Sequence, residues 1–211
     1  MKKILLLGDS IRMGYDSYVK LALEGEAEVC YPSDNCRFTT FMIRNIHEWK
    51  GQLGCDNGVD LVHFNVGLWD CLHMPDGEAL VSIDQYRVNL ERIIRMLKSD
   101  FPSAKIIFAT STPVIERLFG ICKRYNNEIE EYNAVARELM AANGIEVNDL
   151  YALLKDKPES YHSDLTHFYT KIATKEITEQ VLSYIDAALG TTAKKLDYDA
   201  LFGETDNAIG I

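Results

Sequence analysis

Short apolar runs recur along the chain, each three to five residues long and each followed by glycine, proline or polar residues. Runs of this length are typical of strands in a parallel sheet, because both faces of such a strand are buried. The pattern predicts five strands, at residues 3–7, 28–31, 61–64, 105–109 and 145–147.

Between these runs, apolar residues recur at helical spacing. The clearest case is the series Tyr86, Leu90, Ile93, Ile94 and Leu97, which places one apolar stripe along a helix. Similar spacing predicts helices over residues 13–24, 39–53, 129–140 and 170–189. Asn143-Gly144 and Gly190 are expected to end the last two of these helices, since such residues adopt the left-handed conformation at a helix end.

Strands and helices therefore alternate, which predicts an α/β protein. We expect a three-layer α/β/α sandwich around a five-stranded parallel sheet with flavodoxin-like strand order. Residues 1–190 are expected to form a single domain. Residues 191–211 lose the periodicity and are interpreted as a C-terminal extension that packs on the body, contacts a partner subunit or is mobile, so a homo-oligomer is one alternative.

Composition narrows the classes of partner. The formal net charge of −10 disfavours nucleic acid and anionic membranes as partners, and no apolar stretch approaches the length of a membrane span. Five scattered cysteines indicate a reducing compartment, and no metal-binding spacing is present, so we expect no cofactor and no metal. The apolar run near the N-terminus is too short for a signal peptide, and we expect a cytoplasmic location.

Polar residues follow several of the predicted strands. Because the carboxyl ends of parallel strands meet at one edge of the sheet, residues from distant segments are expected to gather there. A serine hydroxyl needs a base within hydrogen-bond reach to act as a nucleophile, and that base needs an orienting group. The candidates are Ser10 as nucleophile, His167 as base and Asp164, three residues before it, as the orienting carboxylate.

Three separate segments resemble the sequence blocks of the SGNH (GDSL-like) hydrolase family. They are Gly8-Asp9-Ser10 after the first strand, Gly67-Leu68-Trp69-Asp70 after the third and Asp164-Leu165-Thr166-His167 near the C-terminus, with a weaker echo in Thr112-Pro113. The resemblance implies a serine ester hydrolase that needs no cofactor and cleaves short acyl esters. Acetyl esters are favoured, with a small molecule or an oligosaccharide as the substrate.

Two positions differ from the family blocks. Trp69 stands where the family has an asparagine that donates to the oxyanion, and no glycine follows the second strand. Four residues are therefore candidates for the oxyanion hole: Asn35, Asn65, Gly67 and Trp69. Arg12 is a candidate for binding an acidic group of the substrate, or alternatively for pairing with Asp16, and His162 is a candidate for lining the cleft.

Two other functions are compatible with the same pattern. One is a catalytically silent member of the same fold that only binds its ligand. The other is a flavodoxin-like phosphate or nucleotide binder, with the anion at the helix that follows Gly8-Asp9-Ser10. An α/β-hydrolase is disfavoured because the sequence G-x-S-x-G is absent.

Overall fold

A computed structural model describes residues 1–203. The five predicted strands form one parallel sheet in the order β2-β1-β3-β4-β5, so the expected flavodoxin-like order is confirmed. Leu7 at the end of β1 pairs with Phe64 at the end of β3, which brings the segments after these strands together. The strands are β1 (Lys2–Leu7), β2 (Ala27–Cys30), β3 (Leu61–Phe64), β4 (Lys105–Ala109) and β5 (Glu146–Asn148).

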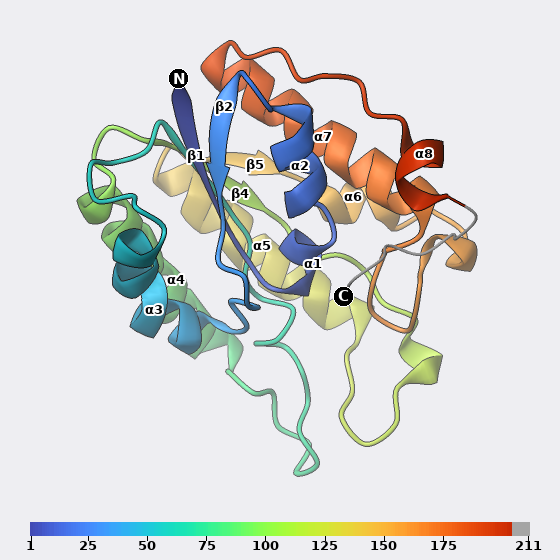
Figure 1. The fold of residues 1–211 in the computed structure, drawn as a ribbon. Coiled ribbons are helices and arrows are strands. Elements are labelled where there is room, and N and C mark those ends of the chain that lie inside the picture. The colour runs from blue at the N-terminus through green and yellow to red at the C-terminus, as the bar shows by residue number, and fades with distance from the viewer. Residues whose placement is uncertain (204–211) are drawn as a thin grey trace.

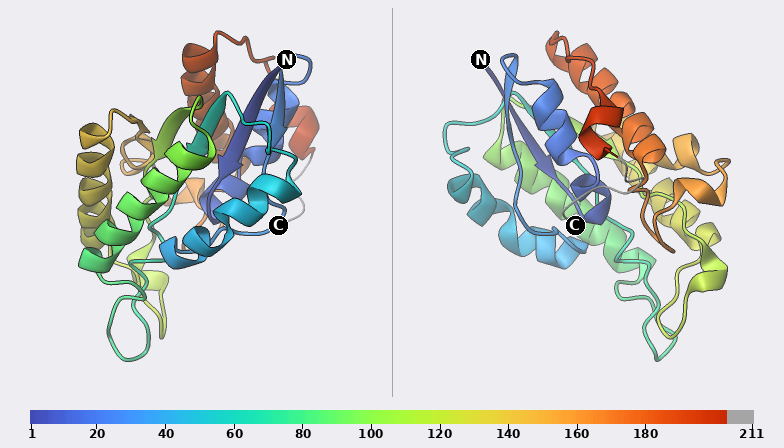
Figure 2. Two further views of the ribbon diagram at one scale, coloured as in Figure 1. Left: turned by 90° about the vertical axis from the view of Figure 1, so that its left-hand side faces the viewer. Right: turned by 45° about the vertical axis from the view of Figure 1, so that its right-hand side comes forward.

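Helices cover both faces of the sheet, as a three-layer sandwich requires (Figures 1 and 2). On one face α3 packs against α4 and α4 against α5, and on the other α2 packs against α7. The α-helices are α1 (Ser10–Met13), α2 (Asp16–Ala22), α3 (Thr39–Gln52), α4 (Ile83–Asp100), α5 (Asn126–Ala142), α6 (Leu150–Leu154), α7 (Lys171–Leu189) and α8 (Tyr198–Phe202). Two short 3-10 helices, η1 (Glu116–Leu118) and η2 (Glu159–Tyr161), lie in loops.

The helix predicted over residues 13–24 is observed as the shorter helix α2, and a separate short helix, α1, precedes it. The turn of α1 closes at Gly14, whose backbone N–H donates to the carbonyl oxygens of Ser10 and Ile11. A side chain at Gly14 has no room, because a Cβ there would lie 2.6 Å from the Tyr169 ring. Apolar spacing alone does not reveal this break, and the helix α6 is too short to produce a period.

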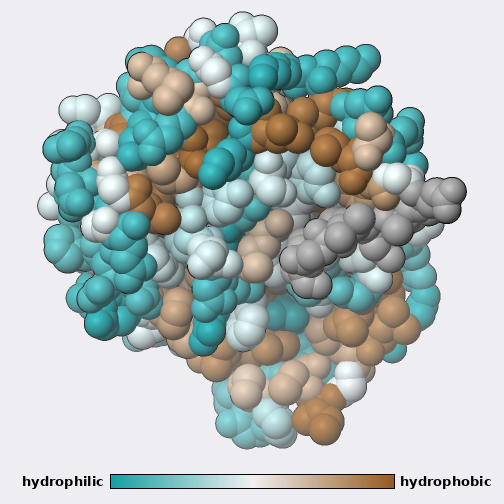
Figure 3. Space-filling model, viewed as in Figure 1, coloured by the Kyte–Doolittle hydropathy of each residue, from teal (hydrophilic) through white to brown (hydrophobic). Residues whose placement is uncertain are grey.

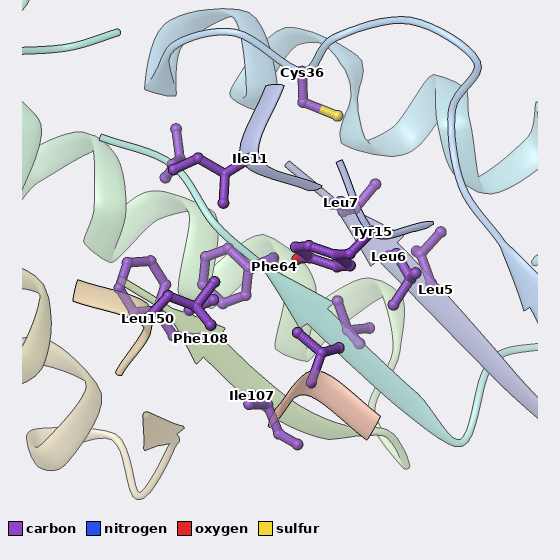
Figure 4. Packing of buried hydrophobic residues seen from close by; sticks show 14 of the residues in the cluster. Leu5, Leu6, Leu7, Ile11, Tyr15, Cys36, Phe64, Ile107, Phe108 and Leu150 are labelled. Atoms are coloured by element: carbon purple, nitrogen blue, oxygen red, sulfur yellow. The ribbon is translucent and has the colours of Figure 1, made fainter. Parts of the chain in front are cut away.

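The sheet lies at the centre of the hydrophobic core, between the two layers of helices. Leu5, Leu6 and Leu7 of β1 and the whole of β3 are buried, and burial of each large aliphatic or aromatic side chain stabilises the fold by about 1.5–3 kcal/mol. Figure 4 shows Ile11 and Tyr15 in the same cluster as these strand residues. The turn that follows β1 is therefore anchored by the core on both sides of α1.

The C-terminal extension packs on the body as far as residue 203. The backbone N–H of Lys194 donates to the carbonyl oxygen of Ala22 at 2.8 Å. Tyr198 and Phe202 of α8 are buried, and the Phe202 ring stacks on Tyr18 of α2 at 5.7 Å. This confirms the first of the three alternatives for residues 191–203, while residues 204–211 lie outside the described part of the chain. Within residues 1–203, no helix has the length and apolar character needed to cross a membrane.

Candidate active site

Ser10 is the first residue of α1, directly beyond the end of β1. The preceding Asp9 caps this helix, since its carboxylate accepts the backbone N–H of Ile11 at 2.9 Å. The first N–H of a helix has no intrahelical acceptor, so the Ser10 backbone N–H is available to a bound group. The Ser10 side chain is nearly buried at 9 % exposure, and within residues 1–203 its hydroxyl makes no hydrogen bond.

Asp164 and His167 form a hydrogen-bonded pair in the loop before α7. Asp164 Oδ2 lies 2.7 Å from His167 Nδ1, while Oδ1 accepts the backbone N–H groups of Thr166 and His167 at 2.7 and 2.8 Å. Burial opposes ionisation of Asp164, but these hydrogen bonds outweigh it and hold the pKa of the carboxyl below its usual range. A carboxylate at Nδ1 fixes the proton there and leaves Nε2 as the basic nitrogen.

Tyr169 connects this pair to the serine. Its hydroxyl donates to the carbonyl oxygen of Ser10 at 2.6 Å, and its ring stacks on the His167 ring with centroids 4.7 Å apart. Ile11, Gly14, Thr112 and His167 line one small cavity together with Tyr169. The structure therefore brings His167 to the helix that begins at Ser10, and Tyr169 is a site residue that the sequence reasoning missed. Its position two residues after His167 was the only available signal.

Asn65 does not face the space beside Ser10. The side chain is fully buried, and its amide nitrogen donates to Asp9 Oδ1 at 2.8 Å. Its Oδ1 lies against Gly8, where a Cβ would approach it to 1.9 Å. The interpretation of Asn65 as an oxyanion donor is therefore corrected: this side chain positions Asp9, whose own pKa is raised by burial.

Asn35 lies in the loop after β2, beside the turn that carries Ser10. The Cys36 backbone N–H donates to the carbonyl oxygen of Gly8 at 3.0 Å. The backbone N–H of Asn35 donates to Asp34, and its Oδ1 accepts the N–H of Arg37, both at 2.7 Å. Arg37 has a φ of 55°, which places it in the left-handed region. These backbone donors are used internally, whereas the side-chain amide nitrogen of Asn35 has no hydrogen-bond partner among the described residues.

Gly67 and Trp69 follow β3. Gly67 has a φ of 141°, and a Cβ there would lie 3.1 Å from the Tyr86 hydroxyl, so only glycine fits this turn. Trp69 is half-buried, and among the described residues nothing accepts a hydrogen bond from its indole N–H. Asp70 accepts the backbone N–H and hydroxyl of Thr39, which ties this loop to α3, and burial raises the pKa of Asp70 to about 7.

Arg12 and His162 were the two candidates for substrate binding. Arg12 is 1 % exposed and pairs with Asp16, while its guanidinium also donates to the carbonyl oxygens of Pro32 and Asp34 at 2.9 and 2.8 Å. Arg12 therefore fixes the loop after β2, which corrects the expectation that it holds a substrate group. His162 packs its half-buried ring on Phe168 at 3.8 Å, and burial lowers the pKa of this imidazole.

Two loops extend beyond the carboxyl edge of the sheet, next to these residues (Figure 1). Residues 71–81 and 115–125 are joined by paired backbone hydrogen bonds between His73 and Lys123, at 2.8 and 3.1 Å. Leu118 and Ile121 are exposed on the second loop, and Figure 3 shows apolar side chains on the surface of this protruding part. The loop after β4 also supports the turn that carries Asp164 and His167, since the Ile115 N–H donates to the Leu165 carbonyl oxygen at 2.9 Å. Across residues 1–203, no three His, Cys, Asp or Glu side chains are grouped so that they could hold a metal ion.

Comparison with known proteins places the chain among acyl hydrolases. The sequence pattern of the GDSL-like Lipase/Acylhydrolase family matches residues 6–171. A comparison of the sequence with curated proteins finds no match. Among solved structures, a lipase/acylhydrolase from Enterococcus faecalis is 22 % identical with a TM-score of 0.71, covering 93 % of this chain and 100 % of that one. The acetylxylan esterase Axe2 from Geobacillus stearothermophilus is 17 % identical with a TM-score of 0.63, covering 87 % and 94 %.

Proposed function

Because the chain belongs to the GDSL-like lipase/acylhydrolase family, whose members are ester hydrolases, we propose that it cleaves short acyl esters through a Ser10–His167–Asp164 triad. The observation that carries this proposal is the pair formed by Asp164 Oδ2 and His167 Nδ1, at 2.7 Å, on a ring that stacks on Tyr169. Through its hydroxyl, Tyr169 connects that ring to the backbone of Ser10.

The first half of the reaction acylates the enzyme. Ser10 Oγ attacks the ester carbonyl carbon while His167 Nε2 takes the hydroxyl proton. Asp164 stabilises the resulting imidazolium. The carbon–oxygen bond to the alcohol then breaks, and the alcohol leaves with the proton from His167, so that the acyl group remains on Ser10.

The second half releases the acid. Water attacks the acyl carbon, His167 takes its proton, and the bond to Ser10 Oγ breaks as the proton returns to the serine. In both halves the oxyanion needs preorganised donors. We assign this role to the backbone N–H of Ser10 and the side-chain amide of Asn35, with the indole N–H of Trp69 in place of the family's asparagine.

We favour an acetyl ester of a carbohydrate as substrate. Two structural neighbours are named acetyl xylan esterases, at 18 % and 17 % identity, which agrees with this choice.

Hydrolysis of p-nitrophenyl acetate and of acetylated xylo-oligosaccharides tests the proposal. We expect Ser10→Ala and His167→Ala to lose activity by several orders of magnitude, because each removes a group that acts in the transition state. Ser183→Ala and His47→Ala are matched controls on the surface of α7 and α3, and they are expected to retain full activity.

Full activity in Ser10→Ala would remove Ser10 from the role of nucleophile. A folded wild-type protein that hydrolyses none of these esters would favour the silent, ligand-binding alternative.

A further inference from the structure

Arg124 is a buried cation at the rim of the candidate site, immediately before α5. Its side chain is 8 % exposed, and Nε donates to the carbonyl oxygen of Leu68 at 2.6 Å. Leu68 lies between Gly67 and Trp69, so this hydrogen bond fixes the guanidinium over the carboxyl end of β3. The ring of Phe119 covers it at 5.8 Å.

The terminal nitrogens of Arg124 lack partners. A guanidinium carries five N–H donors, and only the one on Nε is used here. Within residues 1–203 no carboxylate lies within 4.0 Å of this side chain, since every ion pair of the described chain involves other residues. Among the described residues, the polar atoms that are both enclosed and unpaired belong to other side chains. The terminal nitrogens of Arg124, which are unpaired, are therefore in contact with solvent.

The contrast with Arg12 shows that the lack of partners is specific to this position. Arg12 is buried more deeply, but its guanidinium pairs with Asp16 and also donates to the backbone carbonyl oxygens of Gly8, Pro32 and Asp34. A buried charge is costly unless it is paired, and burial lowers the pKa of Arg124 from its ordinary value. Arg124 is thus a buried cation without a paired carboxylate, in a protein with a net charge of −10, and its position suits an anion that binds from outside.

The site also lies close to the reacting groups. The charge of Arg124 acts on Asp9, the residue before the proposed nucleophile, where it counteracts the effect of burial on the carboxyl pKa. Asp9 and Leu68 follow neighbouring strands, β1 and β3, at the same edge of the sheet. A ligand on the terminal nitrogens of Arg124 would therefore lie at the same edge of the sheet as an ester at Ser10.

We propose that the free edge of the Arg124 guanidinium binds a carboxylate group of the substrate, so that the preferred ester is an acidic one. Two parallel N–H donors match the two oxygens of a carboxylate, and such charge-assisted pairs are among the strongest hydrogen bonds. A single negative charge suits this position better than a phosphate dianion, because the Asp9 carboxyl lies close enough to interact with Arg124. This assignment rests on the proposed esterase function and specifies its substrate class.

Two isosteric esters test the assignment: 4-acetoxybenzoate, which carries a carboxylate, and 4-acetoxybenzamide, which is neutral. We expect the wild type to prefer the acid. In Arg124→Gln we expect the ratio of kcat/KM for the acid over the amide to fall roughly 10- to 100-fold, mainly through KM. Arg124→Lys keeps the charge but cannot donate two parallel N–H groups. We expect its ratio of kcat/KM for the acid over the amide to lie between those of Arg124→Gln and the wild type. Lys123→Gln removes the neighbouring exposed charge and is the matched control, with the wild-type ratio expected.

The outcomes separate the two proposals. If both Arg124 variants fold but lose kcat equally on both esters, Arg124 acts on the oxyanion and the carboxylate assignment is overturned. An unchanged ratio in Arg124→Gln overturns it as well. The wild type could instead cleave the acetyl ester of 4-acetoxybenzamide in a Ser10-dependent manner and show no preference for 4-acetoxybenzoate. That result would support the esterase function and would overturn only the acidic substrate.

Discussion

The hydroxyl of Tyr169 donates a hydrogen bond of 2.6 Å to the carbonyl oxygen of Ser10, across 159 positions of sequence. The same tyrosine ring lies nearly parallel to the His167 ring, at an interplanar angle of 14°. One side chain thus holds the helix of the proposed nucleophile and the ring of the proposed base in fixed relation.

Removing only the Tyr169 hydroxyl tests this relation. Tyr169→Phe keeps the stacking surface and loses one hydrogen bond to a backbone carbonyl, an interaction that contributes about 1 kcal/mol. We expect kcat on p-nitrophenyl acetate to fall roughly 3- to 10-fold with a small decrease in Tm. Tyr151→Phe loses a comparable hydroxyl contact, to Glu130 at a distance from the site, and is expected to keep its kcat. Equal kcat in wild type and Tyr169→Phe would reduce Tyr169 to a packing residue.

Asp164→Asn tests the orienting carboxylate. An asparagine still accepts the backbone N–H groups of Thr166 and His167, so the turn is expected to persist. Its amide group, however, donates toward Nδ1 and favours the wrong tautomer of His167. We expect kcat to fall on the order of 10³- to 10⁴-fold with little change in Tm. Asp156→Asn, an exposed substitution of the same kind, is expected to behave as wild type. Near-normal kcat in Asp164→Asn would exclude the carboxylate from the mechanism.

The His73 side chain links the loop of residues 71–81 to α5 in a pH-dependent manner. Nδ1 lies 2.7 Å from the carbonyl oxygen of Gly77 and Nε2 lies 2.6 Å from Glu128, and Glu78 adds a further negative charge. Burial lowers the pKa of His73, but these acceptors together outweigh it and raise the pKa above its ordinary value. The His73 ring therefore binds its proton more tightly in the folded protein than in the unfolded chain.

The sign of the effect on stability follows from that raised pKa. The contribution of His73 is fully present below the unfolded pKa of about 6.5 and is lost as the pH rises through the higher folded value. We expect His73→Gln to lower the free energy of unfolding more at about pH 6 than at about pH 9 in urea titrations. His47→Gln, an exposed substitution on α3, serves as the control. A stability difference that is the same at both pH values would contradict the protonated link.

Gly8→Ala tests how tightly the nucleophile turn is packed. The added Cβ would lie 1.9 Å from Asn65 Oδ1 and 2.7 Å from Arg12 Cβ, so buried neighbours must move. We expect a loss of about 1–3 kcal/mol in the free energy of unfolding, together with reduced kcat because Ser10 shifts with its turn. Gly120→Ala has open space around its Cβ and is expected to change neither quantity. Wild-type stability in Gly8→Ala would show that the turn can relax.

The amino-acid sequence was sufficient to predict the five strands, because a strand that is buried on both faces leaves a local run of apolar residues. It also determined the turn from Asp164 to His167, since three residues suffice to bring that carboxylate to both the backbone and the ring. Apolar spacing did not predict the short helices α6 and α8 or the break at Gly14. These features depend on contacts with neighbouring residues rather than on a repeating apolar pattern.

Which polar groups are free to act depends on contacts that form only in the folded protein. Arg12 was a candidate from the sequence, but its guanidinium is bonded to Asp16 and to the loop after β2. Arg124 has no signal in the sequence, yet its terminal nitrogens have no partner among the described residues. The amide nitrogen of Asn65 donates a hydrogen bond to Asp9, whereas the amide nitrogen of Asn35 has no partner among the described residues. A side-chain N–H group can bind a substrate only where no other group of the protein already accepts its hydrogen bond. Partners such as Asp9 for Asn65, or Ser10 for Tyr169, lie far away in sequence and meet only when the sheet assembles.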